Sequence, residues 1–546
     1  MDAFPQEILS EIAIYTAAQT FLGPPSAILP LLLVNRWTYS CLSIGSNPYV
    51  YAKIYESKFD LSPALRRLKV HSFPSPNLAQ ELRRKCIMLK RIRDRQGAST
   101  KGSAREDEWL SEFLYQIYLM MLEDEGKNRR QLATYARMDS WLIEFWFDEY
   151  GASGSWRSIQ QGKWPAHNES NCLAMWLLWF LFKPDQLSRG SPHTKRALAI
   201  LKIFSLGAHI YPLVTPSWLN FLPPPSDGGV SQLTPLYHDS NLSLKAPALT
   251  PPAVLCFFAL LGHLPENTEY SPVIPSLAPP LQPAALKALG SEWEYEWGRT
   301  TNLGTKKGSV ERELRDVFKP GSIDGNWMGM FMYTDFNSYG SLISSGSHPQ
   351  FLQNMLIGHQ NQIWHLREYH LYSDDTDDKN EAVKPLAPGG AIRMYLPAGA
   401  LMEETSQGLR ITEPGYGKRT LVYKRAVVSG FHDRAEPEAN DGADREENGE
   451  QGRKRRVIDV IVKGEGQAPW GNFKLLGRVR PRDGFVSLKK DYNVSPNGGD
   501  REKWLYRGYI IGNHNQNISG RWRETMSAPE RPAVYEGCFT MSKVPG

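Results

Sequence analysis

The chain has 546 residues, and its 63 Lys and Arg nearly balance its 58 Asp and Glu, for a formal net charge of +5. This balance gives no general electrostatic reason to bind nucleic acid or a membrane surface. The length predicts two or more domains, and an apolar content of 41% is enough to give each its own core.

The cysteines and the apolar runs of the sequence indicate in which cellular compartment the protein is expected. The five cysteines are far apart and form no CxxC pair, which argues against a disulfide framework. No signal-peptide pattern opens the chain, and the most apolar run, LAMWLLWFLF at 173–182, is about half as long as the ~20 residues needed to span a bilayer. We therefore expect a cytoplasmic or nuclear protein with reduced thiols.

Residues 1–70 begin with a helical pattern. In PQEILSEIAIY the large apolar residues recur on one helix face, at Ile8, Leu9, Ile12 and Tyr15. Asp2 suits the N-cap and Pro5 suits the first turn. The stretch LGPPS ends this helix, so a second helix is expected over 27–39 and a third over 49–59.

Residues 71–318 read mainly as helices. EDEWLSEFLYQIYLMMLED repeats large apolar residues every four positions, and SNCLAMWLLWFLF and PPAVLCFFALL are apolar nearly all round, as expected for central helices. Pro-rich segments such as FLPPPSD separate them. This region is predicted to be an all-α spacer or scaffold, and EWEYEWGR at 292–299 reads as an amphipathic segment at its boundary.

Residues 319–546 change to short strands bounded by Gly and Asn turns. Nine segments favour β-branched and aromatic residues: NWMGMFMYTDF, QIWHLREYHLY, TLVYKRAVVSGF, RVIDVIVKG, NFKLLGRVRP, GFVSLKKDY, KWLYRGYIIGN, NISGRWRE and EGCFTMSKV. With no helices between them, they predict a closed antiparallel barrel or a sandwich. The charged stretch 432–456 is expected to be a disordered insertion. The fold class is thus α+β and multidomain.

The opening stretch resembles a known family. Phe4-Pro5-x-Glu7-Ile8-Leu9-x-x-Ile12, followed by Leu31-Leu32-Leu33-Val34-Asn35-Arg36 and Tyr39, is similar to an F-box of the fungal type. The family pattern reads Leu-Pro-x-Glu-(Ile/Leu)-Leu-x-x-Ile, then a Leu-rich half that ends in Ser or Asn, a basic residue and an aromatic. This chain has Phe at the first position and a longer loop between the two halves.

The resemblance implies an adaptor role. F-box proteins dock a three-helix segment on the Skp adaptor of a cullin-based, SCF-type ubiquitin ligase and present a protein substrate with the rest of the chain. It implies a non-catalytic subunit in the ubiquitination pathway, with no cofactor. The residues expected to bind the Skp adaptor match the motif: Phe4, Pro5, Ile8, Leu9, Ile12, Leu32, Val34 and Trp37.

The β region resembles a second family. GNWMGMFMY at 325–333 and GRWRET at 520–525 are similar to the Gly-x-Trp and late basic residue of lipocalin-like barrels. The resemblance implies that Trp327 closes the barrel base and that Arg521 or Arg523 stacks on it. An ordinary sandwich with aromatic core residues is the alternative.

Candidates for substrate recognition lie in loops at the expected barrel rim. TDFNSYGS at 334–341 and GNHNQN at 512–517 offer Asp335, Asn337, His514 and Asn515, although Asp and Asn also suit plain turns. A phosphopeptide pocket would need clustered arginines, and RVRPR at 478–482 is the nearest basic cluster.

A search for catalytic motifs finds none. The chain lacks a Gly-x-Ser-x-Gly elbow, a His-Glu-x-x-His pair and a phosphate-binding GxxxxGK(S/T) loop. His365 and His370 are an odd number of positions apart, so on one strand they would face opposite sides and could not share a metal. The alternative to the adaptor hypothesis is a ligand-binding or enzymatic barrel whose N-terminal helices are only structural.

Overall fold

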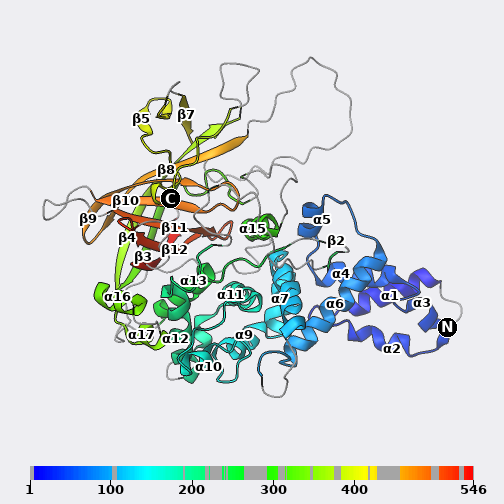
Figure 1. Ribbon diagram of the computed structural model, residues 1–546. Helices are drawn as coiled ribbons and strands as arrows, with labels where there is room; N and C mark the ends of the chain where they lie inside the picture. Colours follow the sequence, from blue (N-terminus) through cyan, green and yellow to red (C-terminus); the bar gives the residue numbers. More distant parts are fainter. Residues whose placement is uncertain are drawn as a thin grey trace, which may run out of the picture.

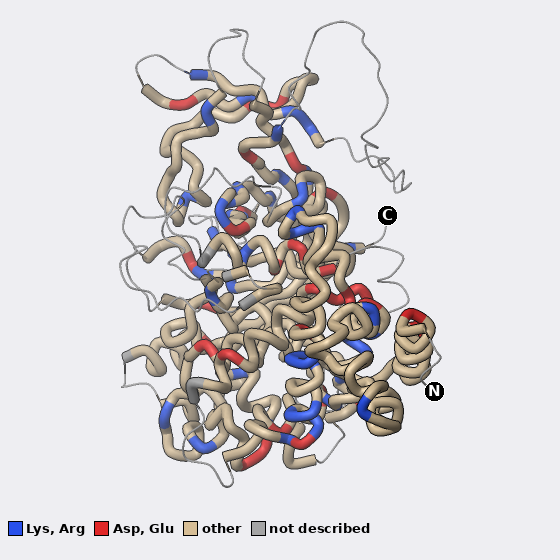
Figure 2. Tube along the Cα trace, turned by 90° about the vertical axis from the view of Figure 1, so that its right-hand side faces the viewer, with Lys and Arg blue, Asp and Glu red and all other residues tan. Residues whose placement is uncertain are grey.

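The computed structural model joins an extended helical part to a C-terminal barrel (Figure 1). It describes residues 5–100, 107–187, 191–214, 221, 236–238, 240–241, 244–263, 292–304, 314, 317–344, 348–373, 383–415, 419–426, 456–492, 503–527 and 534–544. Residues 432–455 of the expected insertion 432–456 lie outside them. Basic and acidic segments are intermixed along the trace, as the balanced composition implies (Figure 2).

Six short helices form the N-terminal part: α1 (Gln6–Ala18), η1 (Ser26–Ile28), α2 (Leu29–Leu32), α3 (Arg36–Leu42), α4 (Pro48–Lys58) and α5 (Ser62–Leu68). The single helix expected over 27–39 is wrong, because a break at Leu33–Asn35 separates α2 from α3. Asn35 causes the break: its side chain accepts the backbone N–H of Thr38 at 2.8 Å, and the Thr38 hydroxyl accepts the N–H of Asn35.

The carboxylate of Asp60 anchors this part to the helical region. One of its oxygens accepts the backbone N–H groups of Glu125, Lys127 and Asn128 at 2.9–3.0 Å. Burial nevertheless raises the pKa of Asp60 to about 6. Helix α1 packs on α3 and α4, and α4 packs on α6 (Ser75–Arg93), so α4 is a second junction between the N-terminal helices and the rest of the molecule.

The helical region is built around α11 (Glu169–Leu181) and α13 (Thr250–His263), which are buried along most of their length, as their composition predicts. Around them lie α7 (Asp107–Leu122), α8 (Lys127–Arg130), the π-helix η2 (Gln131–Tyr135), α9 (Met138–Phe147), α10 (Ser155–Gln160), η3 (Pro184–Gln186), α12 (Pro192–Leu206) and α15 (Glu294–Gly304). A two-stranded hairpin, β1 (Leu236–Tyr237) with β2 (Ser240–Asn241), departs from the all-α expectation. The five cysteines are unpaired.

The C-terminal part is a closed, antiparallel, eight-stranded barrel, as the strand pattern predicts. Its order is β3-β13-β12-β11-β10-β9-β8-β4, and β4 pairs back to β3. The strands are β3 (Gly325–Thr334), β4 (Ile357–Tyr372), β8 (Val457–Ala468), β9 (Gly471–Val479), β10 (Val486–Tyr492), β11 (Lys503–Ile511), β12 (Asn517–Glu524) and β13 (Glu536–Lys543). β13, the last strand in the chain, lies between β3 and β12, so the barrel leaves no free edge there.

Three strands extend the sheet beyond β4: β7 (Thr420–Arg425), β6 (Gly408–Thr412) and β5 (Leu401–Thr405). The pattern predicted β7 but missed β5 and β6, whose sequence is MEETSQGLRIT. Two helices, α16 (Phe336–Ser344) and α17 (Pro349–Asn354), connect β3 to β4. The prediction of a rim loop at 334–341 is therefore wrong, because most of this segment belongs to α16. Asp335 accepts the N–H of Ser338 at 2.8 Å and caps α16.

The barrel and the helices share one apolar core. Outward-facing residues of the barrel, among them Met330, Met332 and Cys538, belong to the same buried cluster as α11, α12 and α13. α13 packs on β12 and β13. The inward-facing residues form a second cluster inside the barrel. The helical part and the barrel are thus joined by a packed interface.

Candidate functional site

Helix α1 carries three of its five large apolar side chains on the outside. Ile8, Ile12 and Tyr15 recur at i, i+4 and i+7 and are 47%, 44% and 71% exposed, whereas the small residues Ala13 and Ala17 on the opposite face are fully buried. An ordinary surface helix buries its large apolar residues. In α1 this order is inverted for Ile8, Ile12 and Tyr15, whereas Leu9 and Ile14 are half-buried and pack on the core.

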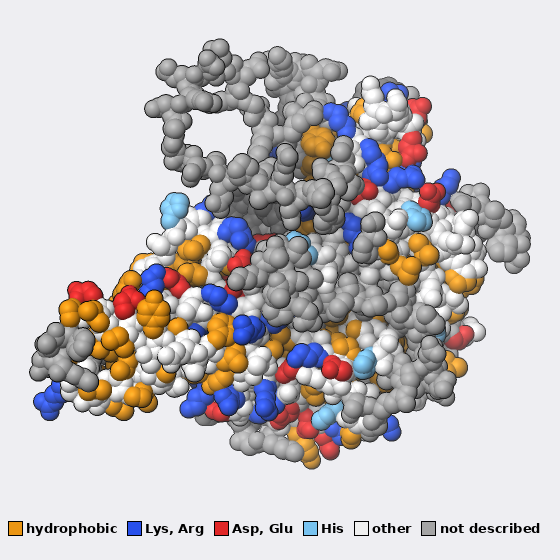
Figure 3. All heavy atoms as spheres, turned by 180° about the vertical axis from the view of Figure 1, so that it is seen from behind, with side chains coloured by type: hydrophobic (Ala, Val, Ile, Leu, Met, Phe, Trp, Pro, Cys, Tyr) orange, Lys and Arg blue, Asp and Glu red, His pale blue; other side chains and the backbone are white. Residues whose placement is uncertain are grey.

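The neighbouring segments extend this apolar surface. Leu29, Leu33, Val34 and Tyr39 are all exposed, Leu33 by 74%. Together with Ile8, Ile12 and Tyr15 they form what we call the N-terminal apolar face. Apolar side chains gather on the projecting arm in the view from behind (Figure 3). Apolar patches of this kind mark interaction surfaces.

The structure divides the eight residues predicted to bind an adaptor. Four are exposed: Pro5, Ile8, Ile12 and Val34. Leu9, Leu32 and Trp37 are half-buried and pack against the core of the chain. Phe4 lies outside the described residues. The predicted set therefore mixes outward residues with residues that hold the helices together, and it missed Tyr15, Leu29 and Leu33, which the helical spacing of large apolar residues could have found.

The barrel interior is filled with large side chains. Trp327, Phe331, Trp364, Phe473 and Phe539 are buried there, and Leu314, Val317, Phe318 and Ile323 pack into the same cluster. The Trp327 indole donates to the carbonyl of Ile323 at 2.8 Å. This end of the barrel is therefore closed by the segment that precedes β3.

The predicted partners of Trp327 are wrong. The cation over its ring is Lys543, at 5.6 Å from the ring centroid. On β12 the side chain of Trp522 points into the barrel, so Arg521 and Arg523 point outward. Arg521 donates to the carbonyls of Phe204 (2.9 Å), Ser205 (3.1 Å) and Tyr211 at the end of α12, and Arg523 lies beside Glu536. Arg521 thus joins the barrel to the helical region.

A fully buried cation, Lys490, lies inside the barrel. Lys490 is 1% exposed, and its ammonium is 3.9 Å from the centroid of the Phe473 ring and 4.9 Å from that of Tyr492. The ammonium donates a hydrogen bond to Oε1 of Gln362, at 3.2 Å. Burial lowers the pKa of Lys490 to about 7. This position could have been predicted from the sequence, because Lys490 alternates with Leu488 and Tyr492, whose side chains also face the barrel interior.

The four polar residues predicted to bind substrate do not come together. Asp335 and Asn337 follow β3 at one end of the barrel, whereas His514 and Asn515 lie in the turn between β11 and β12, at the other end. The backbone N–H groups of His514 and Asn515 donate to Glu292, at 2.8 and 3.0 Å. They hold the start of α15 against the barrel, and burial raises the pKa of Glu292 to about 8.

The basic cluster RVRPR is no exposed phosphate site. Arg478 is fully buried and pairs with Asp459 at 2.8 Å, and Arg480 pairs with Asp483 at 2.6 Å. His365 and His370 face opposite sides of β4, as their spacing predicts: His365 is exposed, and His370 is buried and bonds to Glu368. Within the described residues, no group of three or more His, Cys, Asp or Glu could hold a metal ion.

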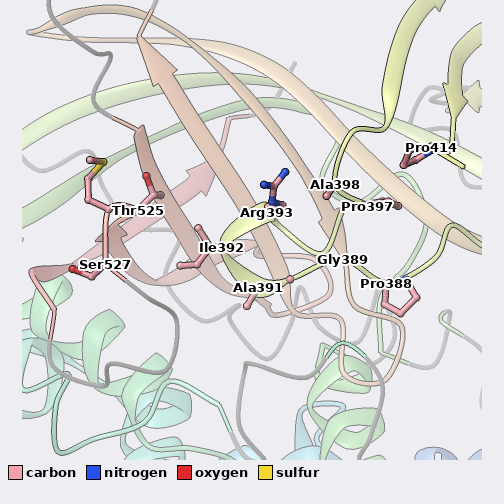
Figure 4. Close-up of a pocket in the computed structure, with 12 residues that line it drawn as sticks. Pro388, Gly389, Ala391, Ile392, Arg393, Pro397, Ala398, Pro414, Thr525 and Ser527 are labelled. Carbon is pink, nitrogen blue, oxygen red and sulfur yellow. The ribbon is translucent and has the colours of Figure 1, made fainter.

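A groove opens between the loop 388–398 and the end of β12 (Figure 4). Its volume is about 820 Å³, and its walls are mainly apolar, with Pro388, Ile392, Pro397, Pro414 and Met526 among them. Met526 is 92% exposed. We call this the loop groove. It was not predicted, because it is made by segments distant in sequence.

No match was found for this chain among models of protein families, curated proteins or solved structures. Among the described residues, no helix is both long enough and apolar enough to cross a membrane. The geometry of the two surfaces described above is therefore the basis for a functional proposal.

Proposed function

We propose that this protein is a substrate-receptor subunit of an SCF-type ubiquitin ligase, with an F-box at its N-terminus that binds the Skp adaptor. The observation that carries the proposal is the inverted helix α1, with Ile8, Ile12 and Tyr15 outside and Ala13 and Ala17 inside. A partner that covers these side chains would gain ~1.5–3 kcal/mol for each one fully buried.

The half-buried residues of the motif fit the same role. Leu9, Leu32 and Trp37 pack on the chain's own core and would hold α1, α2 and α3 in one arrangement before the partner binds. A preorganised surface loses less conformational entropy on association. The hydrogen bonds of Asp60 would then keep this surface at a fixed position relative to the rest of the receptor.

The remainder of the chain would present a protein substrate. The receptor itself would do no chemistry, and it would act by raising the local concentration of the substrate beside a ubiquitin-loaded enzyme. A filled barrel interior suits a recognition scaffold better than a small-molecule carrier. We propose a lipocalin-like barrel that is used through its outer surface and loops, and a cytoplasmic or nuclear location.

The test is direct binding of the full chain to a purified Skp adaptor, measured by calorimetry. Ile8→Asp and Val34→Asp change exposed residues, so each variant should stay folded and lose at least about tenfold in affinity. Leu356→Asp is the matched control, because Leu356 is a large apolar residue that is 84% exposed outside the N-terminal apolar face. Absence of binding by the folded wild-type chain would disprove the proposal.

A ligand-binding barrel is the second candidate, and Lys490 is the observation that favours it. Besides this buried cation, the interior contains Nε2 of Gln362 and Nε1 of Trp364, which are buried and have no hydrogen-bond partner among the described residues. Mass spectrometry of the native protein would decide: a copurifying molecule released by Lys490→Met would support a ligand, and a bare chain would support the filled interior.

A further inference from the structure

The loop groove has a single charged residue in its lining, Arg393. The Arg393 side chain is exposed and has no ion-pair or hydrogen-bond partner among the described residues. It projects from the loop whose neighbouring residues form the apolar wall, and Thr525 and Ser527 lie across the groove (Figure 4). An apolar groove with one available guanidinium is complementary to an apolar segment that carries one anionic group.

The wall that carries Arg393 is held in a strained shape. Met394 and Tyr395 have left-handed backbone angles, with φ of 53° and 62°, although neither is glycine. Such conformations cost about 1–3 kcal/mol each and persist where the surroundings enforce them, often at binding sites. Gly389 lies against the carbonyl of Leu396, where an added Cβ would be 1.8 Å from the oxygen.

A buried ion pair enforces this shape. Arg478 donates to the carbonyls of Leu386 at 2.8 Å and Tyr395 at 3.0 Å, while Asp459 binds the same guanidinium at 2.8 and 2.9 Å. The loop is therefore clamped to the outer face of β8 and β9. A wall that is fixed before binding loses little entropy when a peptide docks.

The number of basic side chains in the loop groove indicates which kind of anion it can bind. A phosphate carries close to two negative charges and is usually gripped by more than one basic group. The groove offers Arg393 alone, since Arg478 and Arg480 are committed to Asp459 and Asp483. A single carboxylate matches a single guanidinium.

The size of the groove indicates what kind of molecule carries that carboxylate. A volume of about 820 Å³ is near the upper part of the range for ligand pockets and holds several residues of an extended peptide. The chain of such a peptide can pass through without ending there. We propose, on the basis of the function proposed above, that the loop groove binds an internal segment of the substrate in which apolar residues flank one aspartate or glutamate that pairs with Arg393.

The test uses labelled octapeptide pools and fluorescence anisotropy with the full chain. Each pool has apolar residues around one fixed position and blocked ends, and that position is Asp, Asn, Lys or phosphoserine. A fifth pool has Asn and a free C-terminal carboxylate. We expect the Asp pool to bind at least about tenfold more tightly than the Asn pool. Arg393→Glu should reverse the preference toward Lys, and Arg83→Glu, which changes an exposed arginine on α6, should not.

Each other outcome overturns the inference. Equal binding of the Asp and Asn pools, no binding of any pool, or an Asp preference that survives in Arg393→Glu would exclude the ion pair. Stronger binding of the phosphoserine pool or of the free-carboxylate pool would replace the internal carboxylate with another anion. Adaptor binding by Arg393→Glu should stay at the wild-type level, so failure of the groove and failure of the ligase proposal are read separately.

Discussion

The ammonium nitrogen of Lys490 lies 3.9 Å from the centroid of the Phe473 ring, inside a barrel whose other interior side chains are mostly apolar. Its ammonium donates to the neutral amide oxygen Oε1 of Gln362, and burial lowers the pKa of Lys490 to about 7. The folded state therefore favours the neutral amine, whereas the unfolded state keeps an ordinary lysine with a pKa near 10.5.

Lys490→Met should stabilise the protein in a pH-dependent way. Below about pH 7 both states of the wild type hold the proton and the cost of burying the cation is complete, up to roughly 5 kcal/mol. The cost shrinks as the pH rises and vanishes near 10.5. Denaturant unfolding at several pH values should show a gain that is largest at pH 7 and below.

The control for this prediction is the adjacent residue. Lys489 directly precedes Lys490 on β10 and is half-buried, with its Nζ 3.5 Å from Oδ2 of Asp491. Lys489→Met should change stability by less than about 1 kcal/mol at every pH. A gain from Lys490→Met that does not depend on pH would show that the cation is not buried as described.

Glu292→Gln should show the opposite pH dependence. Burial raises the pKa of Glu292 to about 8, so the fold favours the protonated carboxyl, and the wild type loses stability as the pH rises from about 4.5 to 8. The amide imitates the protonated form. We expect the variant to gain up to about 5 kcal/mol over the wild type across that window. Equal slopes for both proteins, with exposed Glu11→Gln as reference, would contradict this.

Arg521→Met should destabilise the interface between the barrel and α12. The substitution leaves the carbonyls of Phe204, Ser205 and Tyr211 buried without their donor, at a cost of about 3 kcal/mol. Arg367→Met removes a surface ion pair with Glu465 and should cost less than about 1 kcal/mol. Thermal unfolding compares the two, and equal losses would mean that Arg521 does not join the two parts.

In helix α1, changing a large apolar residue should destabilise the protein less than changing a small one. Ile8→Gln changes an exposed large residue and should leave the free energy of unfolding within about 0.5 kcal/mol of wild type. Ala13→Leu inserts a larger side chain where Ala13 is fully buried and should cost about 1–3 kcal/mol. If Ile8→Gln is the more damaging change, Ile8 packs on the chain itself.

The barrel could be predicted because its strands alternate. β3, β4 and β7–β13 correspond to the nine segments identified by β-branched and aromatic residues. β5 escaped because LMEET is mostly polar and exposed. β6 escaped because GLRIT is only five residues long, although its buried Leu409 and Ile411 alternate with exposed Arg410. α16 escaped because Asp335 and its neighbours are turn formers, and Asp335 here caps a helix instead.

Contacts between distant segments were harder to foresee. The alternation around Trp522 already implied that Arg521 and Arg523 face away from Trp327, and applying it would have removed them from the barrel base. The carbonyls that receive Arg521 could not be found by any local rule, because they lie at the end of α12, more than three hundred residues earlier. The loop groove has the same origin, since its walls come from separate parts of the chain.

The position of β13 affects how this chain must be made. A ribosome releases β3 about two hundred residues before β13, and β3 pairs with β13 on one side and β4 on the other. During synthesis the barrel therefore stays an open sheet with an unpaired edge. The apolar side chains of α12 and α13 that pack against β13 in the folded protein remain exposed to solvent in the meantime. The barrel can close only after β13 has emerged, and we expect the nascent chain to depend on chaperones until then.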